Sequence, residues 1–405
     1  MKQVSVICAS PPHFNPGMHS VDYAFWNYIK RHSFNSAAEF NFYCLLDIPK
    51  EIYNFIEFPF TYKLSDQNIN AINDSDMVIF WGDFLHSKSY LENELCPQAK
   101  KQHAYKNEEF LMDLIYKNLF LENISYRRKT IIIFGGNLLD FRANYYNDER
   151  YISRLKDLYS ASSLILMRDP ISAMTVNNLL NDYEQNFCGV DGAFLSTSNK
   201  TRHLYKSKVD TITVTRKVGI FFGRSWYYDE VLSFSCKMCE RLRATGVWIP
   251  WFHAKPWPLV EKYGDRIDLT APDADYVGTL DQLTECSLVI TDTYHLCINA
   301  WSAGIPAICI GRGVGSMKYS VDDKKKEILY SMFDARDFYV YAEDVLRFFE
   351  KTDLVVSTSN LDNDMDLMIE ILACNTAMEE IFGRIDNHVL SVEKRVTRVL
   401  GDHLL

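Results

Sequence analysis

The sequence lacks the features that mark membrane-spanning, secreted and nucleic-acid-binding proteins. Its 405 residues contain no run of about 18 apolar residues, so we expect no transmembrane helix. Residues 1–8 carry a single charge and too short an apolar run for a signal peptide, and they predict a strand instead. The formal net charge is −10 and the basic residues are dispersed, which argues against nucleic acid as a partner. We therefore expect a cytoplasmic protein, with peripheral attachment at the inner membrane face left open.

Signatures of metal and nucleotide cofactors are missing as well. The ten cysteines are scattered, and Cys236 and Cys239 form a lone C-x-x-C inside a helical pattern that predicts a structural role. Dispersed cysteines of this kind fit a reducing compartment. The paired glycines Gly135 and Gly136 belong neither to a G-x-G-x-x-G nor to a Walker sequence. We expect no metal and no resident cofactor.

What the sequence does contain is an alternation of short apolar runs with helical patterns. A chain of 405 residues is too long for one ordinary core, so two domains are expected. The alternation stops in the polar stretch 196–211 and then restarts, which predicts two doubly wound, Rossmann-like α/β domains facing a cleft. We place them at residues 1–205 and 206–405 and assign the C-terminal helices to the second. The predicted strands lie at 3–9, 39–46, 77–80, 129–134, 163–167, 218–222, 247–250 and 266–269, with two more inside 288–310.

The stretch 288–310 carries the clearest candidate site. It predicts a buried strand, a polar turn at Asp292 and Thr293, a short helix ended by Gly304, and a second buried strand. His295 then falls in the first helical turn, where unpaired N–H groups and the helix dipole favour an anion. The alternative is that His295 only satisfies its own hydrogen bonds in an α/β core.

Other strand ends offer further candidates, each with two interpretations. Gly135-Gly136-Asn137 follows the strand at 129–134, where paired glycines allow either a close ligand approach or a tight turn. Asp169 is expected to cap a helix with Pro170 at its first position, and Arg168 beside it either binds a ligand or holds a neighbouring carboxylate. Loop aromatics such as Trp226 suit sugar rings or rim packing. The run of lysines at 324–326 predicts a solvated helix face.

Several of these landmarks, in this order, resemble the polysaccharide pyruvyl transferase family over roughly residues 75–330. Members carry a Gly-Gly after a mid-domain strand, a strand-end Arg-Asp-x-x-Ser and an Asp-x-x-Phe near the end of the domain. Their second half has a strand ending in Arg, then a turn closing with Arg-x-His and a helix ending in Ala/Ser-x-Gly-x-Pro. The matching segments here are Gly135-Gly136, Arg168-Asp169-Pro170-Ile171-Ser172, Asp191-Gly192-Ala193-Phe194, Arg224-Ser225-Trp226, Thr293-Tyr294-His295 and Ser302-Ala303-Gly304-Ile305-Pro306.

The resemblance implies a GT-B-like fold and transfer of the enolpyruvyl group of phosphoenolpyruvate, the co-substrate, onto a sugar as a ketal with release of phosphate. His295 would protonate the enol carbon, because histidine ordinarily titrates near neutral pH. Arg224 would be the second catalytic residue, a cation for the donor's anionic groups. No metal or cofactor is required. The candidate substrate-binding residues are Thr293, Tyr294, Arg168, Gly135, Gly136, Asn137, Lys318, Arg312, Trp226 and His253.

One position departs from the family pattern. Where the family has an anion-binding Arg two residues before the His, this chain has Thr293. Arg224, Arg312 or Lys318 can replace that cation by reaching the same helix N-terminus. The departure bears on the choice of donor and on whether the chain is catalytic at all.

Two other functions therefore stay open. A GT-B glycosyltransferase that uses a nucleotide sugar would need a Gly-rich loop in the second domain, for which residues 311–315 are the candidate. A non-catalytic relative would bind a glycan without transferring anything to it. For the transferase, the partner is a sugar of a cell-surface polysaccharide or its lipid- or nucleotide-linked precursor, and the oligomeric state is not predicted.

Overall fold

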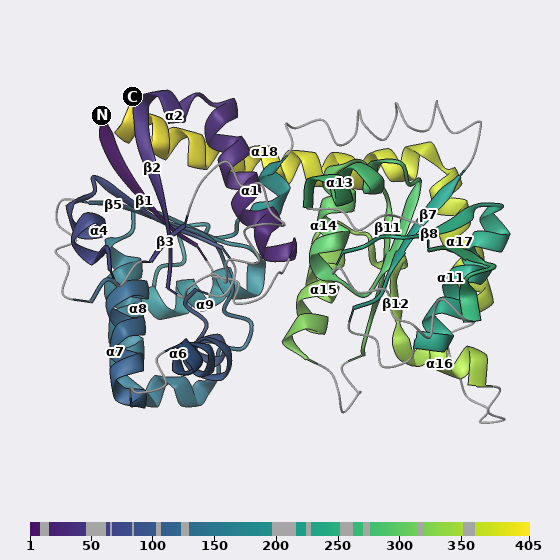
Figure 1. Cartoon of the computed structure of the whole chain (residues 1–405), viewed down its shortest axis with the longest axis horizontal. Coiled ribbons are helices and arrows are strands. Elements are labelled where there is room, and N and C mark those ends of the chain that lie inside the picture. Colours follow the sequence, from purple (N-terminus) through teal and green to yellow (C-terminus); the bar gives the residue numbers. More distant parts are fainter. Residues whose placement is uncertain are drawn as a thin grey trace. The chain divides into compact units, whose positions relative to one another are not determined.

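The computed structural model describes residues 1–8, 16–45, 62–64, 67–82, 85–102, 107–122, 129–196, 216–223, 228–251, 262–269, 276–313, 320–350 and 361–405. The chain forms two compact units, one of Met1–Ser196 with His388–Leu405 and one of Thr197–Asn387 (Figure 1). The predicted domain boundary at 205/206 lies outside the described residues.

The first unit is built on a six-stranded parallel sheet. Its strands are β1 (Lys2–Cys8), β2 (Ala38–Cys44), β3 (Tyr62–Leu64), β4 (Met77–Trp81), β5 (Thr130–Gly136) and β6 (Leu164–Met167). They pair in the order β3-β2-β1-β4-β5-β6. The order therefore reverses between β1 and β4, and in such sheets ligands bind beyond the carboxyl ends of the strands at this switch point.

Helices cover both faces of this sheet (Figure 1). On one face, Phe25 packs against Phe42 and Trp81, with ring centroids 6.1 and 4.3 Å away. On the other, Ile131 and Ile133 join a buried cluster with side chains from several helices, among them α7 (Glu108–Leu119), α8 (Glu149–Ala161) and α9 (Pro170–Leu180). Because successive side chains alternate between faces, the apolar run of β5 supplies both layers. The helical elements are α1 (Pro16–Arg31), α2 (Phe34–Ala37), α4 (Ile69–Asp74), α5 (Lys88–Tyr90), η1 (Leu91–Leu95), α6 (Cys96–Gln102), α7 (Glu108–Leu119), η3 (Ala143–Asn147), α8 (Glu149–Ala161), α9 (Pro170–Leu180) and η4 (Gly192–Ser196).

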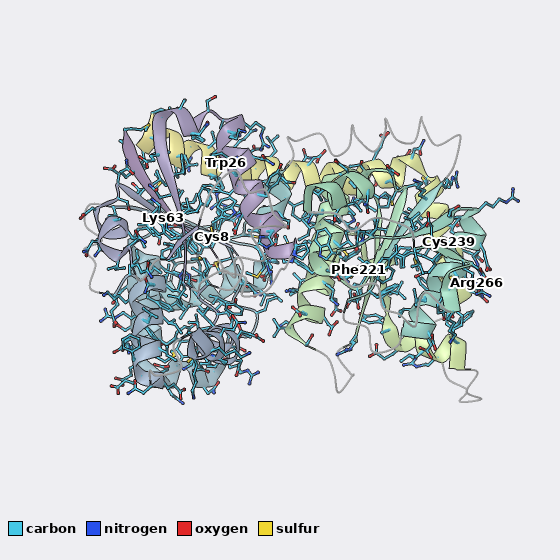
Figure 2. The ribbon with its side chains drawn as sticks, in the orientation of Figure 1. Cys8, Trp26, Lys63, Phe221, Cys239 and Arg266 are labelled. Carbon is cyan, nitrogen blue, oxygen red and sulfur yellow. The ribbon has the colours of Figure 1, made fainter. Side chains whose placement is uncertain are left out.

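The second unit repeats the same topology. Its strands are β7 (Lys217–Phe221), β8 (Thr245–Trp248), β9 (Ile267–Asp268), β10 (Leu288–Thr291), β11 (Ala307–Gly311) and β12 (Tyr339–Tyr341), in the parallel order β12-β11-β10-β7-β8-β9. The order reverses between β7 and β10. Cys8 and Phe221, labelled in Figure 2, end the first strand of each sheet. The helical elements are α11 (Tyr228–Leu242), α13 (Tyr276–Thr284), α14 (Tyr294–Ser302), α15 (Val321–Met332), η5 (Arg336–Phe338), α16 (Ala342–Glu350) and α17 (Leu361–Ala373).

The last helix, α18 (Asn375–Leu404), contributes to both units. From His388 onwards it packs on the first: His388 Nε2 lies 2.7 Å from the Gly189 carbonyl oxygen, and Glu393 bonds Arg31 at 2.6 Å and His32 at 2.8 Å. This corrects the expectation that all the C-terminal helices belong to the second domain. The physical reason is the nearly buried Glu393 carboxylate, 4% exposed, whose partners Arg31 and His32 lie on and just after α1.

No helix in the described part of the chain combines the length and apolar character needed to cross a bilayer.

Replacing Glu393 by Gln tests the attachment of α18. The substitution removes the charge that Arg31 and His32 contact, so we expect the first unit to lose about 1–3 kcal/mol of unfolding free energy. Urea unfolding should show a lower midpoint for the transition of this unit. Glu380→Gln, an exposed position on the same helix, should leave that midpoint in place. Equal midpoints for the two variants would contradict the assignment.

Two histidines of the first unit are buried. Burial lowers the pKa of His86 to about 4 and that of His19 to about 3. The His86 ring lies among Phe80, Phe120 and Tyr159, with centroids 4.9 to 5.7 Å away. Its Nε2 donates to the Leu119 carbonyl oxygen at 2.9 Å, which fixes the neutral tautomer. The folded protein therefore keeps His86 neutral in a pH range, between about 6.5 and 4, in which this histidine is protonated in the unfolded chain.

The pH dependence of stability follows from this difference in protonation. The contribution of neutral His86 is fully present above about pH 6.5 and is lost as the pH falls towards 4, with a slope of up to about 1.4 kcal/mol per pH unit. We expect His86→Gln to be less stable at pH 7 but to have a shallower slope between pH 6.5 and 4. Urea unfolding at several pH values measures both quantities. Parallel curves for the two proteins would rule out His86 as a contributor.

Candidate functional site

The turn between β10 and α14 places three predicted residues at the switch point of the second sheet. Thr293 is the N-cap residue, and its hydroxyl donates to Asp292 Oδ1 at 3.2 Å rather than accepting from the helix. Tyr294 and His295 are the first two residues of α14, and their rings meet edge to face with centroids 5.1 Å apart. His295 is 8% exposed. This confirms the predicted position of His295 in the first helical turn.

Asp292 joins this turn to the neighbouring strand. Its Oδ1 accepts the backbone N–H of Gly223 at 2.9 Å, and Gly223 belongs to the loop that leaves β7. One carboxylate therefore fixes the exits of the two strands between which the sheet order reverses. Arg224 comes directly after Gly223, but Arg224 itself lies outside the described residues, as do Trp226, His253 and Lys318.

Two lysines of α15 are buried against the turn between β10 and α14, although the lysine run 324–326 predicted a solvated helix face. Lys325 is 5% and Lys326 4% exposed. Lys326 Nζ donates to the Asp292 carbonyl oxygen at 3.1 Å and pairs with Asp323 at 2.9 Å. The helical period could have revealed the burial of both lysines. Leu329 follows Lys326 by three residues and Lys325 by four, so it lies on the same helix face, and it is buried.

Asp323 in turn holds the exit loop of β11. Its Oδ1 accepts the backbone N–H of Arg312 at 3.3 Å, and Ser320 forms a capping box with it at the start of α15. Burial opposes ionisation of Asp323, but Lys326, Ser320 and the Arg312 N–H outweigh that effect and hold its pKa below the ordinary value. Arg312 is half-buried beside this cluster.

The predicted residues of the first unit form a separate buried network. Gly135 has a φ of +75°, and a Cβ there would lie 3.6 Å from the Gly192 backbone nitrogen. Arg168 is 2% exposed and its Nη1 lies 3.7 Å from Asp191 Oδ2. This matches the alternative in which Arg168 holds a carboxylate. The motifs Gly135-Gly136, Arg168 and Asp191 thus meet at the carboxyl edge of β5 and β6.

Asn137 belongs to the same network. Its Oδ1 accepts the backbone N–H of Leu139 at 2.8 Å, while the Ser172 hydroxyl donates to Asp169 Oδ2 at 2.7 Å. Asp169 caps α9 through the Ser172 N–H and Pro170 follows it, as predicted. These bonds fix the loop that follows Gly136.

Within the described residues, no group of three or more His, Cys, Asp and Glu side chains is placed to hold a metal ion. Cys236 and Cys239 are buried in α11, and burial raises the pKa of the Cys239 thiol to about 12. A thiol of this kind stays protonated at neutral pH, which suits a small apolar side chain.

Comparison with known proteins identifies the family. A model of the polysaccharide pyruvyl transferase family matches residues 23–313. The chain belongs to this family. The matched segment begins within α1 and ends with the loop after β11, so it includes both the network of the first unit and the turn that carries His295. No match was found among curated proteins.

Solved structures show the fold class. A Listeria monocytogenes protein assigned as a UDP-N-acetylglucosamine 2-epimerase aligns with a TM-score of 0.54 and 11% identity over 100% of this chain and 97% of its own. The UDP-GlcNAc 2-epimerase of Neisseria meningitidis, bound to UDP-GlcNAc, gives 0.53 and 10% over 99% and 100%. S. aureus MnaA with UDP gives 0.51 and 12% over 98% and 96%. The GT-B fold predicted for this pyruvyl transferase relative is confirmed.

The cluster around Lys326 should be decisive for the stability of the second unit. Lys326→Met leaves Asp323 buried without its ammonium partner, so we expect a loss of about 3 kcal/mol of unfolding free energy. Lys324→Met, at the first lysine of the same run, should change the unfolding free energy by less than about 0.5 kcal/mol. Urea unfolding of each variant measures the difference, and adding Asp323→Asn to Lys326→Met should recover part of the loss. A Lys326→Met protein as stable as the wild type would contradict this account.

Proposed function

We propose that this protein transfers the enolpyruvyl group of phosphoenolpyruvate onto two hydroxyls of a sugar, forming a pyruvate ketal and releasing phosphate. The observation that carries the proposal is the family match over residues 23–313, together with His295 in the first turn of α14 at the switch point of the second sheet. The acceptor is a sugar of a cell-surface polysaccharide or of its lipid- or nucleotide-linked precursor.

The reaction needs one proton donor and a site for anions. A proton is added to the methylene carbon, which becomes a methyl group, and the first sugar hydroxyl attacks the adjacent carbon and loses its proton. The bond from that carbon to the phosphate oxygen then breaks, and the second hydroxyl attacks and loses its proton. Of the two hydroxyl protons, one balances the proton added to carbon and the other leaves on hydrogen phosphate.

The residues of the α14 turn suit these steps. His295 supplies the proton to the methylene carbon, a role for which histidine is well matched near neutral pH. The N–H groups of the first turn of α14 bind the carboxylate or the phosphate, because the helix N-terminus favours negative charge. Arg224, which follows Gly223 in the sequence, is the proposed cationic partner. Asp292 positions this loop through its bond to the Gly223 N–H.

The proposal is tested by following phosphate release from phosphoenolpyruvate with a panel of lipid-linked and nucleotide-linked sugars. We expect release that depends on the acceptor and a ketal product detected by mass spectrometry. His295→Gln should lower kcat by about 100-fold or more while leaving protection of the fold by phosphoenolpyruvate largely intact. His388→Gln, at a histidine of the first unit, should keep near-normal kcat.

Three outcomes would count against the assignment. Full activity of His295→Gln would remove His295 from the acid role. Absence of both phosphate release and thermal protection by phosphoenolpyruvate would reject the donor. Thermal stabilisation by a nucleotide sugar alone would favour a glycosyltransferase instead.

A further inference from the structure

Three consecutive lysines at the start of α15 lie in three different environments. Lys324 is half-buried, whereas Lys325 and Lys326 are 5% and 4% exposed. Lys326 is committed to the fold through the Asp292 carbonyl and the Asp323 carboxylate, 3.1 and 2.9 Å away. Lys325 is buried against other groups, Asp322 and the Tyr294 ring.

Lys325 lies against the first turn of α14. Its Nζ is 5.1 Å from the centre of the Tyr294 ring, and that ring lies edge to face with His295. The same ammonium pairs with Asp322 on its own helix at 2.6 Å. The Asp322 side chain is 32% exposed, so water can solvate this carboxylate when the ammonium pairs with another anion.

The positive end of the α14 dipole opposes the Lys325 ammonium, which Asp322 and the Tyr294 ring stabilise. A doubly charged anion placed between the helix N-terminus and this ammonium reverses the sign of their interaction. Lysine binds phosphate well as a point charge, and Lys325 reaches this place from a helix anchored by the neighbouring Lys326.

We propose that Lys325 binds the phosphate of phosphoenolpyruvate. When the donor enters, the Lys325 ammonium leaves Asp322 and pairs with the phosphate. The inference rests on the proposed function and names a binding residue of the same site. When the bond from carbon to the phosphate oxygen breaks, negative charge grows on the leaving phosphate, and the Lys325 ammonium stabilises it there. Phosphoenolpyruvate is thus held by the first turn of α14 on one side and by α15 on the other.

The first test compares Lys325→Met with Lys324→Met, which removes the same charge one residue away. The Kd for phosphoenolpyruvate is measured by calorimetry, and inorganic phosphate and pyruvate serve as competing probes. Lys325→Met should raise the Kd of phosphoenolpyruvate and of phosphate about 10- to 100-fold and leave that of pyruvate within about twofold. Lys324→Met should leave all three within about twofold, and Lys325→Arg should recover part of the loss.

A second variant gives an effect of opposite sign. Asp322→Asn removes the carboxylate that competes with phosphate for Lys325, so it should lower the Kd for phosphoenolpyruvate several-fold. A residue with only a structural role would not tighten binding when its partner is removed. This variant also keeps the proposal testable if Lys325→Met fails to fold.

The outcomes separate the two proposals. Wild-type protein that binds phosphoenolpyruvate, together with Lys325→Met that binds it equally well, overturns the role of Lys325 and leaves the proposed function standing. Unchanged or weaker binding in Asp322→Asn also overturns that role. Selective loss of pyruvate competition assigns Lys325 to the carboxylate and overturns the phosphate assignment. Wild-type protein that binds neither phosphoenolpyruvate nor phosphate overturns both proposals.

Discussion

The second unit depends on one junction, in which the backbone and carboxylate of Asp292 tie four segments together. The carboxylate accepts the Gly223 N–H from the exit of β7, and the carbonyl oxygen accepts Lys326 from α15. Lys326 pairs with Asp323, which accepts the Arg312 N–H from the exit of β11. Because the side chains of Asp292, Asp323 and Lys326 are buried, removing one leaves its partner uncompensated. The turn that presents His295 is therefore held by contacts from outside its own segment.

Much of the fold was predictable, because buried parallel strands appear in the sequence as short β-branched runs between helical patterns. The predicted strand at 129–134 corresponds to β5 within two residues, and β10 and β11 lie inside the stretch 288–311 where two strands were predicted for 288–310. Of the four edge strands of the two described sheets, β3 and β12 were missed, whereas β6 and β9 were predicted. The pairing of β3 with β2 and of β12 with β11 comes from the sheet rather than from a local pattern. The docking of α18 on the first unit was missed for the same reason, since Glu393 meets Arg31 across most of the chain.

The candidate site was predictable only where one segment builds it. His295 at a helix N-terminus follows from the local sequence alone. The burial of Lys325 and Lys326 does not, because a run of charges ordinarily lies in solvent and only the position of Leu329 on the same face indicates otherwise. Arg168 could not be assigned to one of its two roles until Asp191 was placed beside it, 23 residues further along. Long-range pairs decide such cases, and single-sequence patterns do not contain them.

The two sheets have the same strand order, yet their switch points differ in chemistry. At the first, the stacked rings of Trp81 and Phe134 lie 4.1 Å apart, and burial lowers the pKa of His19 to about 3, so that it stays neutral at physiological pH. At the second, Asp292, Lys326 and His295 gather around a helix N-terminus. Topology is identical in the two places, so topology cannot account for the difference. The described side chains at the exits of β7, β10 and β11 therefore support the anion site proposed for the second unit.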